Sequence, residues 1–157
     1  MKKKFLIVNA NYYKDISSGL LKSCKDSIPK NSKIKIVNVP GVFEIPITIS
    51  KNLNKFDAFI SLGCVIKGET PHFDFISQAS TNAIMKLSID SKKPIGNGII
   101  TCLNKNLFFK IKFQRYDPYF LTSKQRYRRR THTQFGLNKH FGRDLVYLTY
   151  QYLFRRH

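Results

Sequence analysis

The chain has 157 residues, 42% of them hydrophobic, and a formal net charge of +19. This length and composition fit one globular domain with a buried core and favour a globular protein over a largely disordered one. No apolar run approaches the ~20 residues that a membrane-spanning helix needs, so a membrane protein is excluded as well.

The positive charge would suggest a nucleic-acid partner, but it is unevenly composed. Residues 1–106 contain 16 Lys, no Arg and 7 acidic residues, whereas residues 107–157 contain 4 Lys, 8 Arg and 2 acidic residues. Thirteen of the 21 Phe and Tyr residues also follow position 107. We therefore interpret residues 1–106 as an α/β domain and residues 107–157 as an atypical basic, aromatic-rich tail, either disordered or frameshifted.

Nucleic-acid binding through the basic run at residues 126–130 is a minor alternative, because such a run is usually a solvated segment. The amino terminus resembles a signal peptide only superficially, since polar Asn9 follows just four apolar residues. We expect a first strand there and a cytoplasmic protein. Cys24, Cys64 and Cys102 have no metal-ligand spacing, so we expect reduced, mostly buried thiols and no bound metal.

Strand and helix patterns alternate over the first hundred residues. Strands are expected at residues 4–9, 33–39, 57–63 and 94–101, and helices at 16–28, 43–53 and 73–88. Asp15 or Ser17 is the expected N-cap of the first helix. The alternation predicts a four-stranded parallel sheet with helices on both faces, and functional sites in such sheets lie beyond the carboxyl ends of the strands.

Residues 39–46 follow the second strand and read Val-Pro-Gly-Val-Phe-Glu-Ile-Pro. Gly41 would let the backbone approach a ligand closely. Glu44 could accept hydrogen bonds from a polyol, and an equally weighted alternative makes it a capping carboxylate at a helix N-terminus.

Residues 63–72 follow the third strand. Gly68, the amides after it and the Thr70 hydroxyl would form an anion nest suited to a phosphate. His72 can exchange a proton near neutral pH, and its position beside an anion loop favours that role over an ordinary surface histidine. Tyr12 and Tyr13, after the first strand, could stack on a flat heterocycle, although simple packing explains such pairs more often.

Three blocks, at residues 39–46, 63–74 and 94–101, together closely resemble the 6,7-dimethyl-8-ribityllumazine synthase family. The resemblance runs from about residue 4 to residue 106, and Gly-Glu-Thr-Pro-His-Phe-Asp at residues 68–74 is its most diagnostic part. It implies a flavodoxin-like three-layer α/β/α fold and self-association into pentamers, in some members into closed shells of sixty subunits.

The resemblance also implies a transferase of riboflavin biosynthesis that acts at the penultimate step. The reaction condenses 5-amino-6-(D-ribitylamino)uracil with 3,4-dihydroxy-2-butanone 4-phosphate, releases phosphate and water, and uses no metal or organic cofactor. Besides these small-molecule substrates and other copies of the chain, no partner is expected.

Residues carried over from the resemblance surround the heterocycle and the ribityl chain. Tyr12 would stack on the pyrimidine, where the family more often has Phe or Trp. The ribityl chain and the ring would be held by Val42, Phe43 and Glu44. The pyrimidine pocket would be completed by Cys64, Val65 and Ile66.

The remaining carried-over residues serve the phosphate and the proton transfers. Glu69 and Thr70 would lie at the phosphate, and His72 would move protons during imine formation and phosphate elimination. Asn97, often Phe in the family, would contribute from the adjacent subunit, so that a complete site requires the oligomer.

The resemblance stops after residue 106. The phosphate-binding arginine of the family falls, by counting, on Ile111, where the nearest cations are Lys110, Lys112 and Arg115. The Ala- and Glu-rich closing helix of the family is unrecognisable. A catalytically impaired relative is therefore the alternative to a working enzyme.

The abrupt change in Arg, aromatic and acid content motivates a hypothesis: a frameshift put the sequence from about residue 107 out of register. The coding DNA tests it directly. We expect one of the other two reading frames to encode an arginine followed by a Lys- and Ala-rich helix. If neither frame does, the frameshift hypothesis is wrong.

Overall fold

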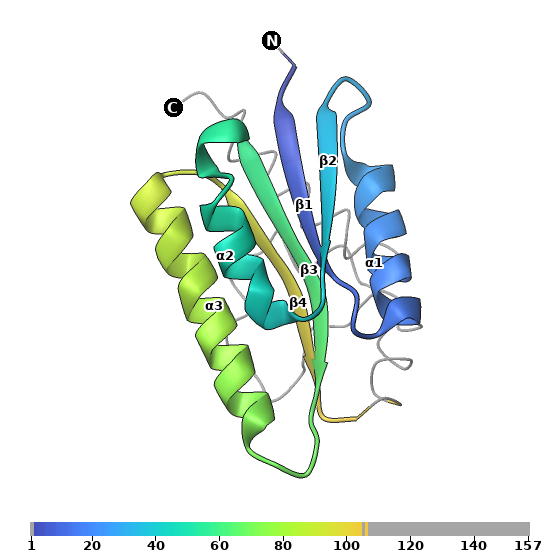
Figure 1. Ribbon diagram of the computed structural model, residues 1–157. Helices are drawn as coiled ribbons and strands as arrows, with labels where there is room; N and C mark the ends of the chain where they lie inside the picture. The colour runs from blue at the N-terminus through green and yellow to red at the C-terminus, as the bar shows by residue number, and fades with distance from the viewer. Residues whose placement is uncertain (1, 105, 107–157) are drawn as a thin grey trace, which may run out of the picture.

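Four apolar runs of the sequence form the strands of one parallel sheet in a computed structural model that describes residues 2–104 and 106 (Figure 1). The strands lie in the order β2-β1-β3-β4. They are β1 (Lys4–Ala10), β2 (Lys33–Val39), β3 (Ala58–Ile66) and β4 (Ile95–Cys102). The order changes direction between β1 and β3, which makes their carboxyl ends the switch point of the sheet.

Helices cover both faces of this sheet (Figure 1). α1 (Lys14–Ser27) lies on one face, and α2 (Ile45–Ser50) and α3 (His72–Ser91) lie on the other. The expected three-layer α/β/α fold with a four-stranded parallel sheet is confirmed. Among the described helices, none is both long and apolar enough to cross a membrane.

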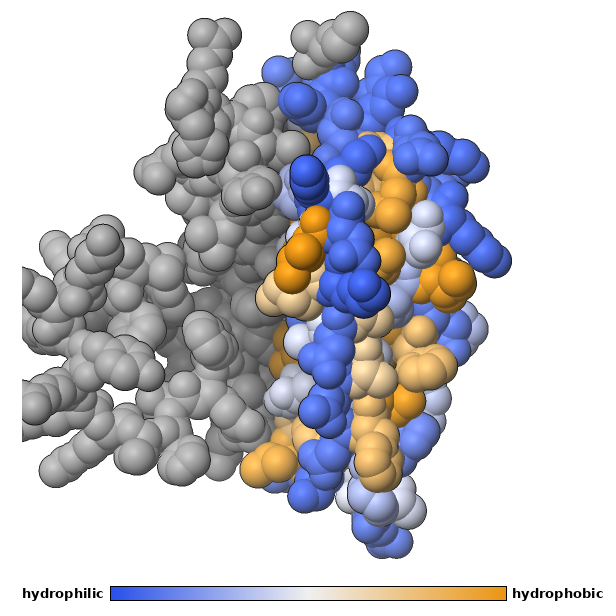
Figure 2. Space-filling view, turned by 90° about the vertical axis from the view of Figure 1, so that its left-hand side faces the viewer, coloured by the Kyte–Doolittle hydropathy of each residue, from blue (hydrophilic) through white to orange (hydrophobic). Residues whose placement is uncertain are grey.

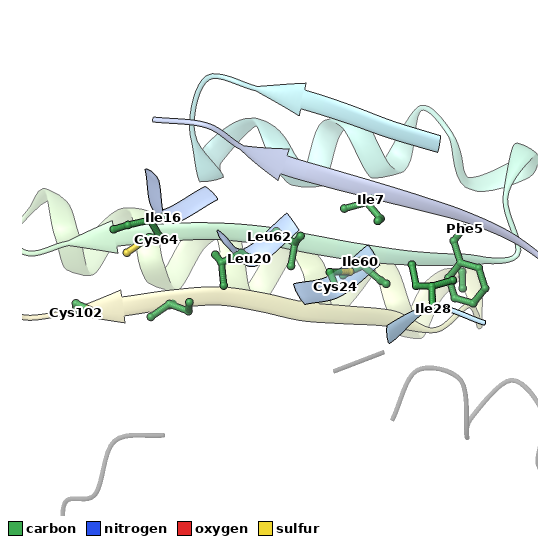
Figure 3. Packing of buried hydrophobic residues seen from close by; sticks show 12 residues of the cluster. Phe5, Ile7, Ile16, Leu20, Cys24, Ile28, Ile60, Leu62, Cys64 and Cys102 are labelled. Atoms are coloured by element: carbon green, nitrogen blue, oxygen red, sulfur yellow. The ribbon is translucent and has the colours of Figure 1, made fainter. Parts of the chain in front are cut away.

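The core has two halves because successive side chains of a strand point to opposite faces. On β1, Phe5 and Ile7 pack toward α1, whereas Leu6 and Val8 pack toward α2 and α3. Figure 3 shows the α1 half, where Cys24 of α1 lies against the strand side chains. Cys24, Cys64 and Cys102 are all buried, as expected.

The expected helix at residues 43–53 is wrong in its extent. The structure has a 3₁₀ turn η1 (Val42–Glu44), the short helix α2 and a second 3₁₀ turn η2 (Leu53–Lys55). Pro46 lies in the first turn of α2, where its missing N–H and fixed φ are tolerated. An uninterrupted helix through residue 53 is therefore replaced by three short pieces.

Two local expectations also need correction. β3 does not end at Gly63 but continues to Ile66, because its last residues pair with β4, with Ile66 opposite Cys102. Neither Asp15 nor Ser17 caps α1: the N-cap is Tyr13, and the Ser17 hydroxyl donates to the carbonyl of Lys14 at 3.1 Å. The expectations for residues 107–157, including Ile111 and the basic run, lie outside the described residues.

Lys93 joins the turn before β4 to the segment before β3. Its ammonium group donates to the carbonyl oxygens of Leu53 at 2.6 Å and of Phe56 at 2.8 Å. Both carbonyls belong to the segment that joins α2 to β3. The half-buried ammonium group of Lys93 therefore holds this segment against the end of α3.

We expect Lys93→Met to lower the free energy of unfolding by about 1.5–3 kcal/mol, because the two carbonyls lose a charged donor. Urea denaturation measures the change. Lys86→Met is the matched control, since Lys86 forms only an exposed ion pair with Asp90 at 2.9 Å and its loss should cost less than about 0.5 kcal/mol. Equal effects of the two substitutions would contradict the role of Lys93.

Candidate active site

The loops after β1, β2 and β3 surround a cleft of about 460 Å³ at the carboxyl edge of the sheet. This volume suits a small-molecule ligand. Nine of the eleven site residues expected from the sequence line the cleft: Tyr12, Val42, Phe43, Glu44, Cys64, Val65, Ile66, Thr70 and His72. The fold therefore gathers residues that are up to sixty positions apart in the chain.

Two expected site residues do not line the cleft. Glu69 is exposed in the loop between β3 and α3. Asn97 is exposed on β4, and its side-chain oxygen accepts a hydrogen bond from the backbone N–H of Ile99 at 3.1 Å. Phe73 and Ile76 line the cleft although they were not expected there. Residues three positions apart on a helix lie on the same face, so the spacing of these two residues at the start of the predicted third helix could have indicated that they line the cleft together.

Glu44 is held by a local contact with the backbone. Its Oε2 accepts a hydrogen bond from the N–H of Gly41 at 2.9 Å. This is the kind of capping contact that the sequence allowed as the alternative to ligand binding. A carboxylate can accept about four hydrogen bonds, so one contact orients Glu44 in the cleft wall and leaves it able to bind a hydroxyl.

Gly63 determines how closely β3 approaches η1. A Cβ atom at Gly63 would lie 2.5 Å from Cγ1 of Val42 and 3.1 Å from Cβ of Ala10. Only a residue without a side chain leaves room for Val42, which is itself buried. The position of the turn that carries Val42 and Glu44 into the cleft thus depends on this glycine.

The anion-binding role expected of Gly68, the amides after it and the Thr70 hydroxyl stays a prediction. No glycine in the described part of the chain has a positive φ, so a nest here would need a turn conformation rather than alternating right- and left-handed residues. Thr70 does not cap α3 either, because the N-cap is Pro71. What remains at this end of the cleft is the start of α3, whose first-turn amides and helix dipole favour an anion. Thr70 and His72 are both exposed there.

Tyr12 and Tyr13 form an aromatic pair that also lines the cleft. Their ring centroids lie 4.9 Å apart with an interplanar angle of 80°, an edge-to-face contact. Tyr12 is 75% exposed and Phe43 is 59% exposed, so the cleft offers two open aromatic surfaces to a ligand.

Cys64 lines the cleft from β3 and is almost fully buried. A hydrogen bond with the side chain of Cys102, together with burial, raises the pKa of Cys64 well above its usual value. The same hydrogen bond lowers the pKa of Cys102. Cys64 therefore presents a buried, protonated thiol to the cleft, and a protonated thiol is a poor nucleophile.

A doubly wound parallel sheet with a ligand-sized cleft at its switch point defines an α/β ligand-binding domain of the flavodoxin-like class. In the described residues, no group of three or more His, Cys, Asp and Glu side chains could hold a metal ion. The family model for 6,7-dimethyl-8-ribityllumazine synthase matches residues 2–107. The chain belongs to the 6,7-dimethyl-8-ribityllumazine synthase family.

Individual relatives match this chain over a length similar to that of the family model. The 6,7-dimethyl-8-ribityllumazine synthase of Methylobacterium nodulans is 39% identical over 106 residues, which are 62% of this chain and 59% of the relative. Those of Agrobacterium fabrum and Bartonella tribocorum are 39% and 40% identical over 111 residues. The match with the Agrobacterium fabrum protein covers 66% of this chain and 75% of that relative, and the match with the Bartonella tribocorum protein covers 67% of this chain and 74% of that relative. The chain thus spans about three fifths of the length of the Methylobacterium nodulans relative.

We expect Gly63→Ala to lower the free energy of unfolding by about 1–3 kcal/mol, because the new methyl group overlaps the stiff side chain of Val42. Thermal or urea denaturation measures the loss. Gly19→Ala is the control: a Cβ at Gly19 meets nothing within 4 Å, and alanine in the middle of α1 should stabilise by about 0.5–1 kcal/mol. A neutral Gly63→Ala would contradict the close approach of β3 to η1.

Proposed function

We propose that the protein condenses 5-amino-6-(D-ribitylamino)uracil with 3,4-dihydroxy-2-butanone 4-phosphate to form 6,7-dimethyl-8-ribityllumazine, the penultimate step of riboflavin biosynthesis. The observation that carries this proposal is the composition of the cleft. One cavity of suitable volume joins an open aromatic ring, a carboxylate held in place and a helix N-terminus that bears a histidine. Membership of the family supports the same reaction.

The heterocycle and its ribityl chain would occupy the half of the cleft nearest β1 and β2. Tyr12 would stack on the pyrimidine, whose polar edge would meet the last residues of β3, including Val65 and the protonated Cys64. Val42, Phe43 and Glu44 would contact the ribityl chain, with the fixed carboxylate accepting hydrogen bonds from its hydroxyl groups.

The phosphate would lie at the start of α3. The Thr70 hydroxyl and the first-turn amides of the helix donate hydrogen bonds, and the helix dipole favours a negative group. An ionised carboxylate repels phosphate, so we assign any contribution of Glu69 to its backbone N–H.

His72 is proposed to move protons during imine formation and phosphate elimination. The amine of the uracil attacks the ketone of the second substrate, and loss of water gives an imine. Elimination of phosphate follows, and ring closure with loss of a second water completes the product. Imidazole can accept and return protons near neutral pH, and His72 lies on the cleft beside the phosphate end. No organic cofactor or metal takes part in this scheme.

We propose that the protein assembles into pentamers, the unit from which some members of the family build closed shells of sixty subunits, and that it works in the cytoplasm. Exposed apolar side chains on α3 and α2 support self-association (Figure 2). They include Phe75, Met85 and Ile89, which are 66%, 59% and 65% exposed. Asn97, exposed on β4, would then reach the cleft of an adjacent copy.

The second candidate is a catalytically impaired relative. Ile111 stands where the resemblance places the phosphate-binding arginine, and no arginine precedes position 115. Loss of a charged clamp on a transferring or leaving phosphate typically costs about 10²-fold or more in rate.

Product formation separates the two candidates. We expect lumazine absorbance and fluorescence to appear when the full chain meets both substrates. His72→Gln should lower kcat by about 10²-fold or more, because proton transfer is lost while the cleft persists. Lys22→Gln, an exposed position on α1, is the control and should leave kcat unchanged. A folded chain that forms no product would support the impaired relative instead.

A further inference from the structure

Tyr13 lies between the cleft and the core. It lines the cleft beside Tyr12, yet it also packs against the buried cluster under α1. Its backbone is fixed as the N-cap of α1, with its carbonyl accepting a hydrogen bond from the N–H of Ser17 at 2.9 Å. Tyr13 is therefore an anchored residue, whereas Tyr12 is 75% exposed.

The contact between the two rings restrains the exposed one. At 4.9 Å between centroids and 80° between planes, the rings lie edge to face, near the short end of the usual range for aromatic pairs. The surroundings cover only a quarter of Tyr12, so this contact is a large part of what orients its ring. A ring that is already ordered loses less conformational entropy when a ligand stacks on it.

The hydroxyl of Tyr13 stays protonated. Burial raises its pKa above the usual value, and the neighbouring Tyr12 and Cys64 raise it further. An uncharged phenol is compatible with the apolar cluster behind it, so the ring can keep one orientation across the neutral pH range.

We propose that Tyr13 is a positioning residue that holds the ring of Tyr12 in the orientation required to stack on the heterocyclic substrate. It would thereby set the affinity for the ribitylaminouracil and leave the affinity for the ketose phosphate unaffected. This inference rests on the proposed function, because it takes the flat ligand of the cleft to be that uracil.

Steady-state kinetics with Tyr13→Leu tests the proposal. The KM for the ribitylaminouracil should rise about three- to tenfold, the range expected for loss of one aromatic contact. The KM for the ketose phosphate and kcat should change less than about twofold. Tyr13→Phe keeps the ring and should recover most of the lost affinity. An unchanged KM for the uracil, or an equal rise of both KM values, would overturn the proposal.

A double-mutant cycle with Tyr12→Ala separates positioning from general damage to the fold. If Tyr13 acts through Tyr12, Tyr13→Leu should add less than about twofold once the ring of Tyr12 is gone. The same increase in KM in both backgrounds would show that Tyr13 acts independently of Tyr12. Circular dichroism and the melting temperature verify that each variant is folded.

Equilibrium dialysis with the ribitylaminouracil alone distinguishes failure of this proposal from failure of the proposed function. If the parent chain binds the uracil but forms no product, the proposed activity fails. In that case the double-mutant cycle of Tyr12 and Tyr13 is repeated with the Kd for the uracil in place of KM, and it still decides the role of Tyr13. If the parent chain neither binds the uracil nor converts it, both proposals are wrong.

Discussion

The two central strands, β1 and β3, are apolar on both faces, and most of the remaining structure follows from this constraint. All but the first residue of β1 are buried, as are the first seven residues of β3. A strand of this kind needs a layer of helices on each side, and parallel strands can be joined only by crossovers that supply them. The crossovers bring the loops after β1, β2 and β3 to one edge, where the cleft lies.

Close approach then shapes this edge in detail. Because Gly63 has no side chain, Val42 packs directly against β3, and the following Glu44 is oriented by the N–H of Gly41. Cys64, the residue after Gly63 on β3, is buried beside Cys102, and a hydrogen bond joins the two side chains. The cleft wall therefore consists of groups whose orientation is determined by backbone and core contacts, which is the arrangement that pre-organised binding requires.

Much of this could be predicted from the sequence, because strand patterns and loop motifs are local signals. The four strands were expected within a few residues, and nine of eleven expected site residues line the cleft. The errors have non-local or competing causes. β3 was extended by pairing with β4, whose register no local pattern encodes. Gly68 has no positive φ, because a glycine permits that conformation without requiring it. The roles of the site residues stay predictions.

The two longest helices, α1 and α3, differ in how many of their residues are buried. Four of the fourteen residues of α1 are buried, but only Ser80 and Ile84 among the twenty of α3. Helical hydrogen bonds alone hold a segment weakly in water, so the free energy of local opening should be lower for α3 than for α1. His72 is the first residue of α3. Fraying of this helix would therefore remove the histidine from the cleft while the sheet remains intact, so that the site can be lost without global unfolding.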